Sequence, residues 1–352
     1  MNSVLVTGGA GYIGSIMVQA LRRAGYRTVV FDNLSDGHEA AVKHEELVEG
    51  DLLDRNAVRT LLRRHRPTAI MHFAAVCSVK ESVENPFKYY ATNVTGTANL
   101  LEAALEVGVP RFIFSSTAAL YGEPEEVPIT ESHPLRPINP YGWSKLFGEQ
   151  MLADAAKAYG IRYVAFRYFN AAGADPTAGL GEDHDPETHL IPLAIRAALS
   201  DDRELIVFGD DYPTRDGSCI RDYIHVLDLA EAHLLGLKYL EGEGESVSLN
   251  LGTQAGTSVL EIVNAVGKAA GTPVSYRVAG RRAGDPAVLI ASSGKAREVL
   301  GWTPKHDLDD MIASAYEFIR RHPDGYPDGP SPADELAVRL PQPEPDDSGV
   351  TR

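Results

Sequence analysis

The stretch Thr7-Gly8-Gly9-Ala10-Gly11-Tyr12-Ile13-Gly14 decides the fold, because it follows an apolar run at Val4–Thr7 and opens a helical pattern. That pattern places apolar residues at i, i+3 and i+4 spacing: Ile13, Ile16, Met17, Ala20, Leu21 and Ala24. In this position Gly8 permits a tight turn, Gly11 allows a pyrophosphate to approach the backbone, and Gly14 lets the helix pack closely. A helix N-terminus also presents free N–H groups to an anion. The sequence therefore predicts a dinucleotide-binding strand–turn–helix unit.

An acidic residue ends the next predicted strand. Asp32 lies eighteen residues beyond Gly14, close to the roughly 20-residue spacing at which a carboxylate accepts hydrogen bonds from the adenosine ribose. A carboxylate there repels a 2′-phosphate, so we expect NAD rather than NADP. The alternative is that Asp32-Asn33 only begins a turn. Asp51, after the third predicted strand, fits either the adenine edge or a helix cap.

Short β-branched runs alternate with amphipathic patterns through the first half of the chain. The predicted strands are Val4–Thr7, Thr28–Asp32, Leu47–Glu49, Ala69–Phe73, Arg111–Ser115 and Tyr163–Phe166. The predicted helices that follow the first unit are Asp54–His65, Tyr89–Val107 and Tyr141–Ala158. This alternation predicts an α/β fold with a Rossmann-type, doubly wound parallel sheet over residues 1–171.

The strand–helix rhythm weakens after Asn170, where Gly, Asp and Pro gather. We expect a smaller α/β substrate-binding region over residues 172–321, with some of its segments returning to the first sheet. Its predicted elements are helices at Leu190–Leu199 and Val226–Leu240, a strand at Leu205–Phe208, and a helix opened by the capping box Ser258-x-x-Glu261. The C-terminal segment 322–352 is rich in Pro and Asp, and we expect it to be flexible beyond residue 341.

Composition excludes several classes of partner. The 352 residues carry a formal net charge of −16 without a basic run, so nucleic acid is not an expected ligand. No apolar run approaches the ~18–20 residues of a membrane span, and no basic, apolar leader follows Met1. Two cysteines are too few for a disulfide framework. We expect a cytoplasmic protein with no membrane contact and no metal.

Tyr141 and Lys145 lie four residues apart in a helical pattern, so both side chains leave the same face. A phenol ionises near pH ~10, but an adjacent ammonium and an oxidised nicotinamide both favour the phenolate. Alone, such a pair is more often a solvated helix face. It gains weight from Ser115-Ser116-Thr117, because the end of the fifth predicted strand places Thr117 at the ligand-binding edge of the sheet. Thr117, Tyr141 and Lys145 then form a hydride-transfer triad, and the alternative is that Thr117 only closes a turn.

From Val4 to about Lys305 the chain resembles the UDP-glucose 4-epimerase family of extended short-chain dehydrogenases/reductases. The resemblance rests on a series of local motifs in addition to the Thr7–Gly14 stretch. These are His72-Phe73-Ala74-Ala75, Glu81-Ser82-Val83, Phe114–Thr117, Leu120-Tyr121-Gly122, Pro140-Tyr141-Gly142-Trp143-Ser144-Lys145, Arg167-Tyr168-Phe169-Asn170, Phe208–Thr214, Arg221–Val226 and Arg281-Arg282-x-Gly284-Asp285.

The resemblance implies a homodimeric isomerase that takes a UDP-sugar and NAD. The residue matching Tyr141 removes the proton of the sugar 4-hydroxyl while the C4 hydride leaves, and the hydride returns to the opposite face of the rotated 4-keto sugar. Implied cofactor contacts are Gly8, Gly11, Tyr12, Ile13, Gly14, Asp32, Asn33, Asp51, Leu52, Phe73, Ala74, Ala75, Asn93, Ser115, Tyr141, Lys145 and Phe169. Implied substrate contacts are Thr117, Asn170, His189, Leu190, Phe208, Arg221, Arg282 and Asp285. Arginine forks also suit a diphosphate on chemical grounds.

Three positions depart from the family pattern. Cys77 stands where many members have a cofactor-contacting lysine, with Lys80 three residues on. Thr117 replaces the commoner serine and keeps the hydroxyl. Leu289 occupies a pocket position linked to acceptance of N-acetylated sugars, and its intermediate bulk leaves that substrate open.

Three other functions compete with UDP-glucose 4-epimerisation. A nucleotide-sugar 4,6-dehydratase needs an additional acid and base beside the threonine, and this chain has Ala118-Ala119 there. A non-catalytic NAD sensor of the same fold would not need the triad. A 4-epimerase of UDP-pentose or UDP-uronate needs only small changes in the pocket.

Overall fold

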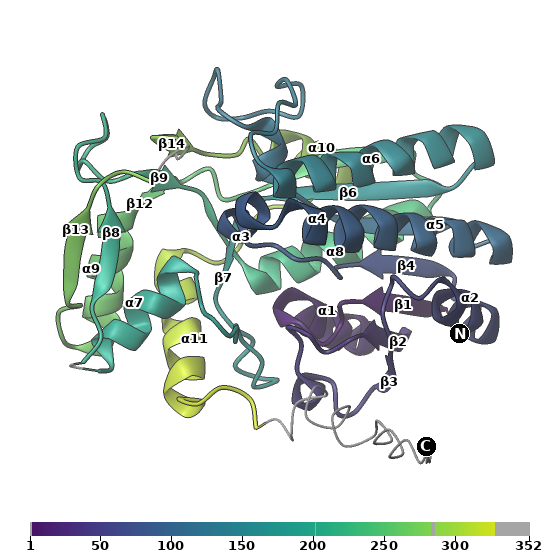
Figure 1. Cartoon of the computed structure of the whole chain (residues 1–352), viewed down its shortest axis with the longest axis horizontal. Helices are drawn as coiled ribbons and strands as arrows, with labels where there is room; N and C mark the ends of the chain where they lie inside the picture. The colour runs from purple at the N-terminus through teal and green to yellow at the C-terminus, as the bar shows by residue number, and fades with distance from the viewer. Residues whose placement is uncertain (1, 201, 283–285, 328–352) are drawn as a thin grey trace, which may run out of the picture.

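The computed structural model describes residues 2–200, 202–282 and 286–327 (Figure 1). Within them, the larger part is built on a seven-stranded sheet in the order β11-β6-β5-β4-β1-β2-β3, and every neighbouring pair is parallel. Its strands are β1 (Ser3–Thr7), β2 (Arg27–Asp32), β3 (Glu46–Glu49), β4 (Ala69–His72), β5 (Arg111–Thr117), β6 (Arg162–Tyr168) and β11 (Val247–Leu251). The predicted doubly wound parallel sheet is confirmed.

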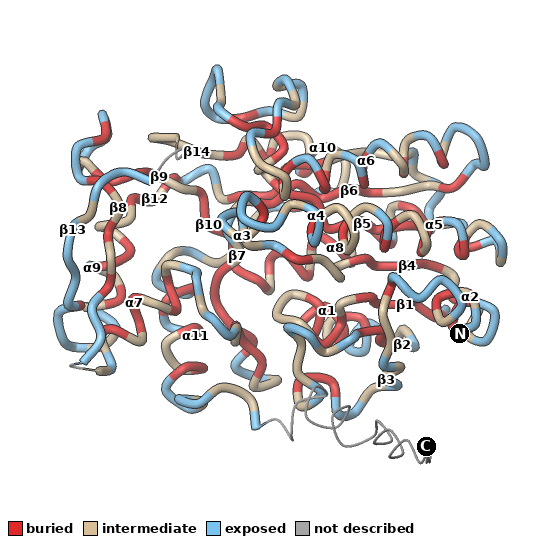
Figure 2. The backbone as a smooth tube through the Cα atoms, viewed as in Figure 1, coloured by how far each residue is buried: buried red, intermediate tan, exposed pale blue. Residues whose placement is uncertain are grey.

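Both faces of this sheet are covered by helices, because successive side chains of each buried strand point to opposite faces. Val4 and Val6 of β1 share one apolar cluster with helices α1 and α8, whereas Leu5 packs on the other face with α2, α5 and α6. Figure 2 shows the resulting buried band along the strands. The helices run over α1 (Tyr12–Arg23), α2 (Arg55–His65), α5 (Gly96–Val107), α6 (Pro140–Tyr159) and α8 (Val226–Glu241).

One predicted helix differs in detail from the structure. The stretch Tyr89–Val107 was expected to be a single α-helix, but it begins earlier and changes winding along its length. It consists of α4 (Pro86–Tyr89), the π-helical turn η2 (Tyr90–Thr95) and α5. The wider turn coincides with Asn93, whose buried side chain bonds away from the helix to the backbone of Val76. Apolar periodicity predicts that a helix exists and does not report such a local change of winding.

The smaller part, on the left of Figure 1, joins short strands to helices α7, α9 and α11 around a third apolar cluster. Its elements are α7 (Leu190–Ala198), β8 (Leu205–Phe208), β9 (Ile220–Arg221), β12 (Thr257–Ser258), α9 (Val259–Ala270), β13 (Tyr276–Ala279), β14 (Val288–Leu289) and α11 (Leu308–Arg321). The predicted capping box at Ser258 is confirmed, since the Ser258 hydroxyl accepts from Glu261 N and the Glu261 carboxylate accepts from Ser258 N.

The two parts are interleaved along the chain. Helix α8 and strand β11 return to the large sheet after the smaller part has begun, and α10 (Gly294–Leu300) lies beside them. The pair β7 (Asn170–Ala172) and β10 (Tyr223–His225) connects the parts. The remaining short elements are η1 (Glu39–Ala41), α3 (Val79–Glu84) and η3 (Ala118–Tyr121). Within the described ranges, no helix is long and apolar enough to cross a bilayer.

Candidate active site

The glycine turn between β1 and α1 is packed too tightly for side chains. Gly8 has a φ of +69°, and a Cβ there would lie 2.3 Å from Ala74 N. A Cβ on Gly14 would lie 2.0 Å from the Gly8 carbonyl oxygen. Both Phe73 N and Ala74 N donate to the Thr7 carbonyl oxygen, at 2.9 and 3.0 Å. The segment after β4 is therefore held against the turn, as the dinucleotide fingerprint requires.

The N-terminus of α1 fits a pyrophosphate. Its N-cap is Gly11, and no side chain of the described residues caps this end. The first-turn N–H groups thus keep the free donors and the partial positive charge that favour an anion. A dinucleotide phosphate lying across Gly8 and Gly11 is the group that these residues fit.

Gly14→Ala tests how far the turn depends on missing side chains. We expect the substitution to lower the free energy of unfolding by about 1–3 kcal/mol and to weaken NAD binding, because the added methyl group meets backbone atoms. Gly294→Ala is the control, since a Cβ there meets only Ser292 Oγ, at 3.8 Å. Urea denaturation and NAD titration measure both effects. Equal behaviour of the two variants would contradict the packing argument.

Asp32 lies at the end of β2 beside the glycine turn. Its Oδ2 accepts from Ala10 N at 2.9 Å and its Oδ1 accepts from Leu34 N at 2.9 Å. Burial raises the pKa of this carboxyl group, and the hydrogen bond from Ala10 opposes that shift. Each carboxylate oxygen retains lone-pair capacity for a further donor, such as a ribose hydroxyl.

Asn33 and Asp51 are paired next to Asp32. Asn33 Nδ2 donates to Asp51 Oδ2 at 3.2 Å, and Asp51 Oδ1 accepts from Leu53 N at 2.7 Å. The helix cap that was the alternative for Asp51 belongs instead to Asp54, whose side chain accepts from Asn56 N and Ala57 N. Leu52, between them, is buried.

Thr117, Tyr141 and Lys145 come together at the carboxyl end of β5. The Thr117 hydroxyl lies close enough to the Tyr141 phenol to lower its pKa, and Lys145 Nζ donates to the Ser115 carbonyl oxygen at 2.9 Å. Asn139 caps α6 by accepting from Gly142 N at 2.8 Å, which fixes the helix turn that carries the tyrosine. The three side chains that the sequence singled out thus form one group.

The electrostatics of this group differ from the sequence-based expectation. Burial raises the Tyr141 pKa, and the Thr117 hydroxyl is the neighbour that opposes this shift. Burial also lowers the pKa of Lys145 to about 8, and its ammonium is turned toward Ser115. The lysine ammonium and an oxidised nicotinamide were both expected to favour the phenolate, and Lys145 is not among the groups that lower the Tyr141 pKa. In this structure the phenol needs additional positive charge, which an oxidised nicotinamide ring would supply.

Cys77, which stands where many members of the family that the chain resembles have a cofactor-contacting lysine, lies at the same end of the sheet. Its exposed thiol is close enough to interact electrostatically with Tyr141, Lys145 and Tyr168. Lys80 does not replace the missing family lysine, because its exposed ammonium lies 3.8 Å from the Glu84 carboxylate on α3. Position 77 therefore presents a thiol, rather than an ammonium, to the catalytic group.

Two predicted cofactor contacts are engaged within the protein. Asn93 Oδ1 accepts from Val76 N, while its Nδ2 donates to Val76 O at 3.0 Å and to Ser144 Oγ at 2.9 Å. Ser115 shares a short hydrogen bond with the Tyr168 hydroxyl. The bonds of Asn93 hold the segment after β4 against the start of α6, and the bond of Ser115 holds Tyr168. Asn93 and Ser115 therefore support the side of the site where the cofactor is expected. Tyr168 was missed as an individual residue because hydrogen bonding across strands leaves no sequence periodicity.

Several of the predicted substrate residues lie at separate places on the smaller part. Arg282 lies over the Phe208 ring, 4.4 Å from its centroid. Arg221 is the register partner of Leu289 in the β9–β14 pair. His189 is the N-cap of α7 and Leu190 is its first residue. Asp285 lies outside the described residues.

Asp222, which had no assigned role, connects Asn170 to the segments that follow β11 and β14. Its carboxylate accepts from Thr253 N at 2.8 Å and Ala291 N at 3.0 Å, and its carbonyl oxygen accepts from Asn170 Nδ2 at 2.8 Å. Leu289 and Phe169 pack on one apolar cluster beside Tyr121. Leu289, the pocket position linked to acceptance of N-acetylated sugars, therefore lies next to the segment that follows Thr117.

A parallel sheet with a glycine turn at β1 and a Thr–Tyr–Lys group beyond β5 defines an extended short-chain dehydrogenase/reductase. The NAD dependent epimerase/dehydratase family model matches residues 4–252. The chain belongs to this family and, within it, to the UDP-glucose 4-epimerases, as its similarity to relatives of that name shows.

The similarity extends over nearly the whole length of the relatives. The chain is 52% identical to "UDP-glucose 4-epimerase" of Rhizobium meliloti over 92% of this chain and 99% of the relative. It is also similar to the crystal structure of UDP-glucose 4-epimerase from Brucella ovis in complex with NAD, with a TM-score of 0.88 and 51% identity over 90% of this chain and 98% of that one. The chain also matches the structure of the UDP-Glc/GlcNAc 4-epimerase from Campylobacter jejuni with a TM-score of 0.80 and 43% identity. This match covers 91% of this chain and 100% of that chain.

Proposed function

We propose that this protein interconverts UDP-glucose and UDP-galactose by NAD-dependent epimerisation at C4. The observation that carries the proposal is the grouping of Thr117, Tyr141 and Lys145 at the sheet edge that also bears the glycine turn. Relatives named for this activity at about half sequence identity support it.

When bound, NAD supplies the two-electron acceptor for the hydrogen on C4 and afterwards its donor. The protein's own groups then have separate tasks. Tyr141 accepts the proton of the 4-hydroxyl and later returns it, and Thr117 orients that hydroxyl through its own hydrogen bond. Lys145 holds the nicotinamide ribose. Gly8 and Gly11 admit the pyrophosphate to the backbone, and Asp32 accepts from the adenosine ribose.

The smaller part provides the sites for the sugar nucleotide. We assign the diphosphate to Arg221 and Arg282, because a guanidinium binds two oxygens at once. Asn170 and the start of α7 at His189 and Leu190 complete that side, with Phe208 and Asp285 toward the uridine. Residues 1–171 together with α8, α10 and β11 form the cofactor domain in this proposal, and the rest of 172–321 forms the substrate domain.

Purified protein supplied only with NAD is expected to convert UDP-glucose into a mixture with UDP-galactose. No external reductant is needed, because the hydride taken from C4 is given back. Chromatography of the sugar nucleotides measures the conversion. Parallel assays with UDP-N-acetylglucosamine, UDP-pentoses and UDP-uronates test the range of sugars that Leu289 allows into the pocket. Formation of a 4-keto-6-deoxy sugar would instead identify a dehydratase, and conversion of pentoses or uronates alone would replace the assigned substrate.

We also propose that the protein is a homodimer and acts in the cytoplasm. A group of large apolar side chains is exposed on α3, α4 and α6, which pack together: Val79, Val83, Phe87, Trp143 and Phe147. Phe87 is 81% exposed, and the Trp143 and Phe147 rings lie 5.8 Å apart. A group of exposed apolar side chains on packed helices is typical of a protein–protein interface, and a second copy provides a matching one.

Phe87→Glu is expected to weaken dimerisation at least about 30-fold, because a buried interface anchor is replaced by a charge. Tyr159→Glu is the control, since Tyr159 is 69% exposed at the far end of α6 and lies outside the group. Light scattering during size-exclusion chromatography over a dilution series gives the molar mass of each variant. Unchanged dimers of Phe87→Glu would refute this interface.

A further inference from the structure

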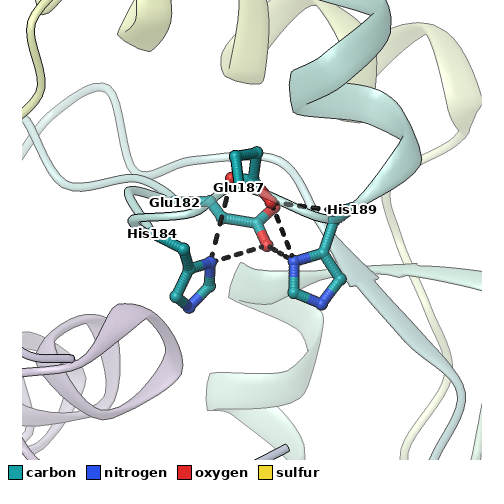
Figure 3. Close-up of side chains that lie close together, drawn as sticks. All are labelled: Glu182, His184, Glu187 and His189. Carbon is teal, nitrogen blue, oxygen red and sulfur yellow. Dashed lines mark hydrogen bonds and ion pairs between the residues drawn. The ribbon is translucent and has the colours of Figure 1, made fainter. Parts of the chain in front are cut away.

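Four side chains with metal-binding atoms meet in the segment between β7 and α7 (Figure 3). They are Glu182, His184, Glu187 and His189, and one ligand atom from each lies within 4.8 Å of those of the others. In Figure 3 the Nδ1 atoms of both histidines face the two carboxylates. The catalytic group of Thr117, Tyr141 and Lys145 uses none of these four side chains, so this cluster needs its own explanation.

The distances between histidine nitrogens and carboxylate oxygens in the cluster lie on both sides of those in a tetrahedral ligand set. Zinc binds imidazole nitrogen and carboxylate oxygen at about 2.0–2.2 Å, which places neighbouring ligand atoms of a tetrahedron about 3.3–3.6 Å apart. His184 Nδ1 lies 3.4 Å from Glu182 Oε1 and 3.8 Å from Glu187 Oε2. His189 Nδ1 lies 2.8 Å from Glu182 Oε1 and 3.1 Å from Glu187 Oε1. One ligand atom from each of the four side chains lies within 4.8 Å of the others, so side-chain movements without a change of fold would bring them around one ion.

Two atoms of the cluster also lack a hydrogen bond among the described residues. Glu187 Oε1 accepts from Thr188 N at 2.7 Å and His189 N at 2.8 Å, but Oε2 accepts from no donor. The Glu187 side chain is only 1% exposed. His184 Nδ1, which faces Oε2, is likewise buried without a hydrogen bond. A buried carboxylate oxygen in this state is costly unless a cation or donor satisfies it.

We propose that Glu182, His184, Glu187 and His189 bind one divalent transition-metal ion of the zinc class. Two imidazoles and two carboxylates suit a borderline cation better than Ca²⁺ or Mg²⁺, which prefer more oxygen ligands. One dication also balances the two carboxylates when both imidazoles are neutral. Four protein ligands close the tetrahedron, so the ion is structural and leaves no open position for catalysis.

The surroundings of the cluster indicate what such an ion would stabilise. Burial raises the pKa of the Tyr12 phenol, and the charges of Glu182 and Glu187 raise it further, so the cluster lies close to the first turn of α1. The Tyr12 hydroxyl donates to the Gly173 carbonyl oxygen at 2.7 Å, which ties α1 to the same connecting segment. The metal would therefore fasten the segment that joins the two parts next to the dinucleotide turn. His189 binds through Nδ1, which leaves its Nε2 for other contacts.

Metal binding is measured on the full chain without a metal-binding tag, stripped with a chelator and free of sugar nucleotide, so the result does not depend on the proposed activity. Zn²⁺ is titrated against a chromophoric competitor, and Co²⁺ reports coordination geometry through its visible absorption. His184→Gln and Glu187→Gln each remove one ligand. His44→Gln and Glu126→Gln remove the same side-chain types at exposed positions far from the cluster in sequence.

We expect one equivalent of Zn²⁺ per chain, a tetrahedral Co²⁺ spectrum, and a zinc-dependent rise of the melting temperature. Each ligand variant should lose at least about tenfold in zinc affinity and lose the rise in melting temperature, whereas both control variants keep them. Circular dichroism identifies any variant that fails to fold, and the other ligand variant then gives the result. Absence of stoichiometric uptake, or equal affinity in ligand and control variants, overturns the proposal and leaves an ion-pair cluster.

Discussion

Replacing Tyr141 by phenylalanine lowers the rate of 4-epimerisation by about 10²–10⁴-fold, the range that general acid–base catalysis supplies, and leaves NAD bound. Only the hydroxyl is removed, so the ring keeps its edge contact with Tyr89 at a centroid distance of 6.4 Å. What is lost is the proton acceptor that the Thr117 hydroxyl favours. Steady-state turnover of UDP-galactose and an NAD titration separate the effects on chemistry and on cofactor binding.

Tyr159→Phe serves as the control for that experiment, because it makes the same change at an exposed position of the same helix. It is expected to turn over like the unchanged protein. Near-full activity of Tyr141→Phe would refute the assignment of the phenol as acid and base. Loss of NAD from Tyr141→Phe would assign the phenol to cofactor binding instead.

Glu149→Gln is expected to destabilise the fold by roughly 3–5 kcal/mol, since it leaves a buried charge without its partner. Glu149 on α6 and Arg167 on β6 are 6% and 7% exposed. The carboxylate accepts from Arg167 Nε at 2.9 Å and Nη2 at 2.6 Å, and from Ser116 Oγ at 2.5 Å. This network fastens α6, which carries Tyr141, to the strand that ends in Thr117.

Glu106→Gln makes the same chemical change at the surface. Glu106 contacts Arg59 and Arg63 but is 34% exposed, and exposed pairs contribute at most about 1 kcal/mol. Urea denaturation of both variants gives their free energies of unfolding. A similar small loss for both would contradict the claim that the buried pair positions α6.

The fold was predictable where hydrophobic periodicity carries it. All six predicted strands of the large sheet are present. β1, β2, β4, β5 and β6 are largely buried and carry apolar runs, whereas β3 at the edge of the sheet is only partly buried. Strand β11 was missed as a strand, although Ser248 and Asn250 alternate with apolar residues in the period typical of one. Those polar residues have partners far away in sequence: Ser248 bonds Glu149, and Asn250 bonds Tyr121.

The candidate site was predictable where a local spacing determines the geometry. One helix turn separates Tyr141 from Lys145, and the end of a parallel strand places Thr117 beside them. Asp222 became visible only in three dimensions, because its partners come from separate segments. Cys77 was marked in the sequence as a departure from the family pattern, but its closeness to Tyr141 became visible only in the structure. The cluster that ends at His189 follows no common metal-binding spacing, so the sequence indicated no metal there.

The central claim is that hydrogen leaves C4 of the sugar as a hydride and returns to the same carbon. UDP-galactose carrying deuterium at C4, incubated with the protein and NAD in ordinary water, tests it most directly by mass spectrometry and NMR of the UDP-glucose formed. The account predicts that the product keeps its deuterium at C4. UDP-glucose with hydrogen from the solvent at that carbon would contradict it.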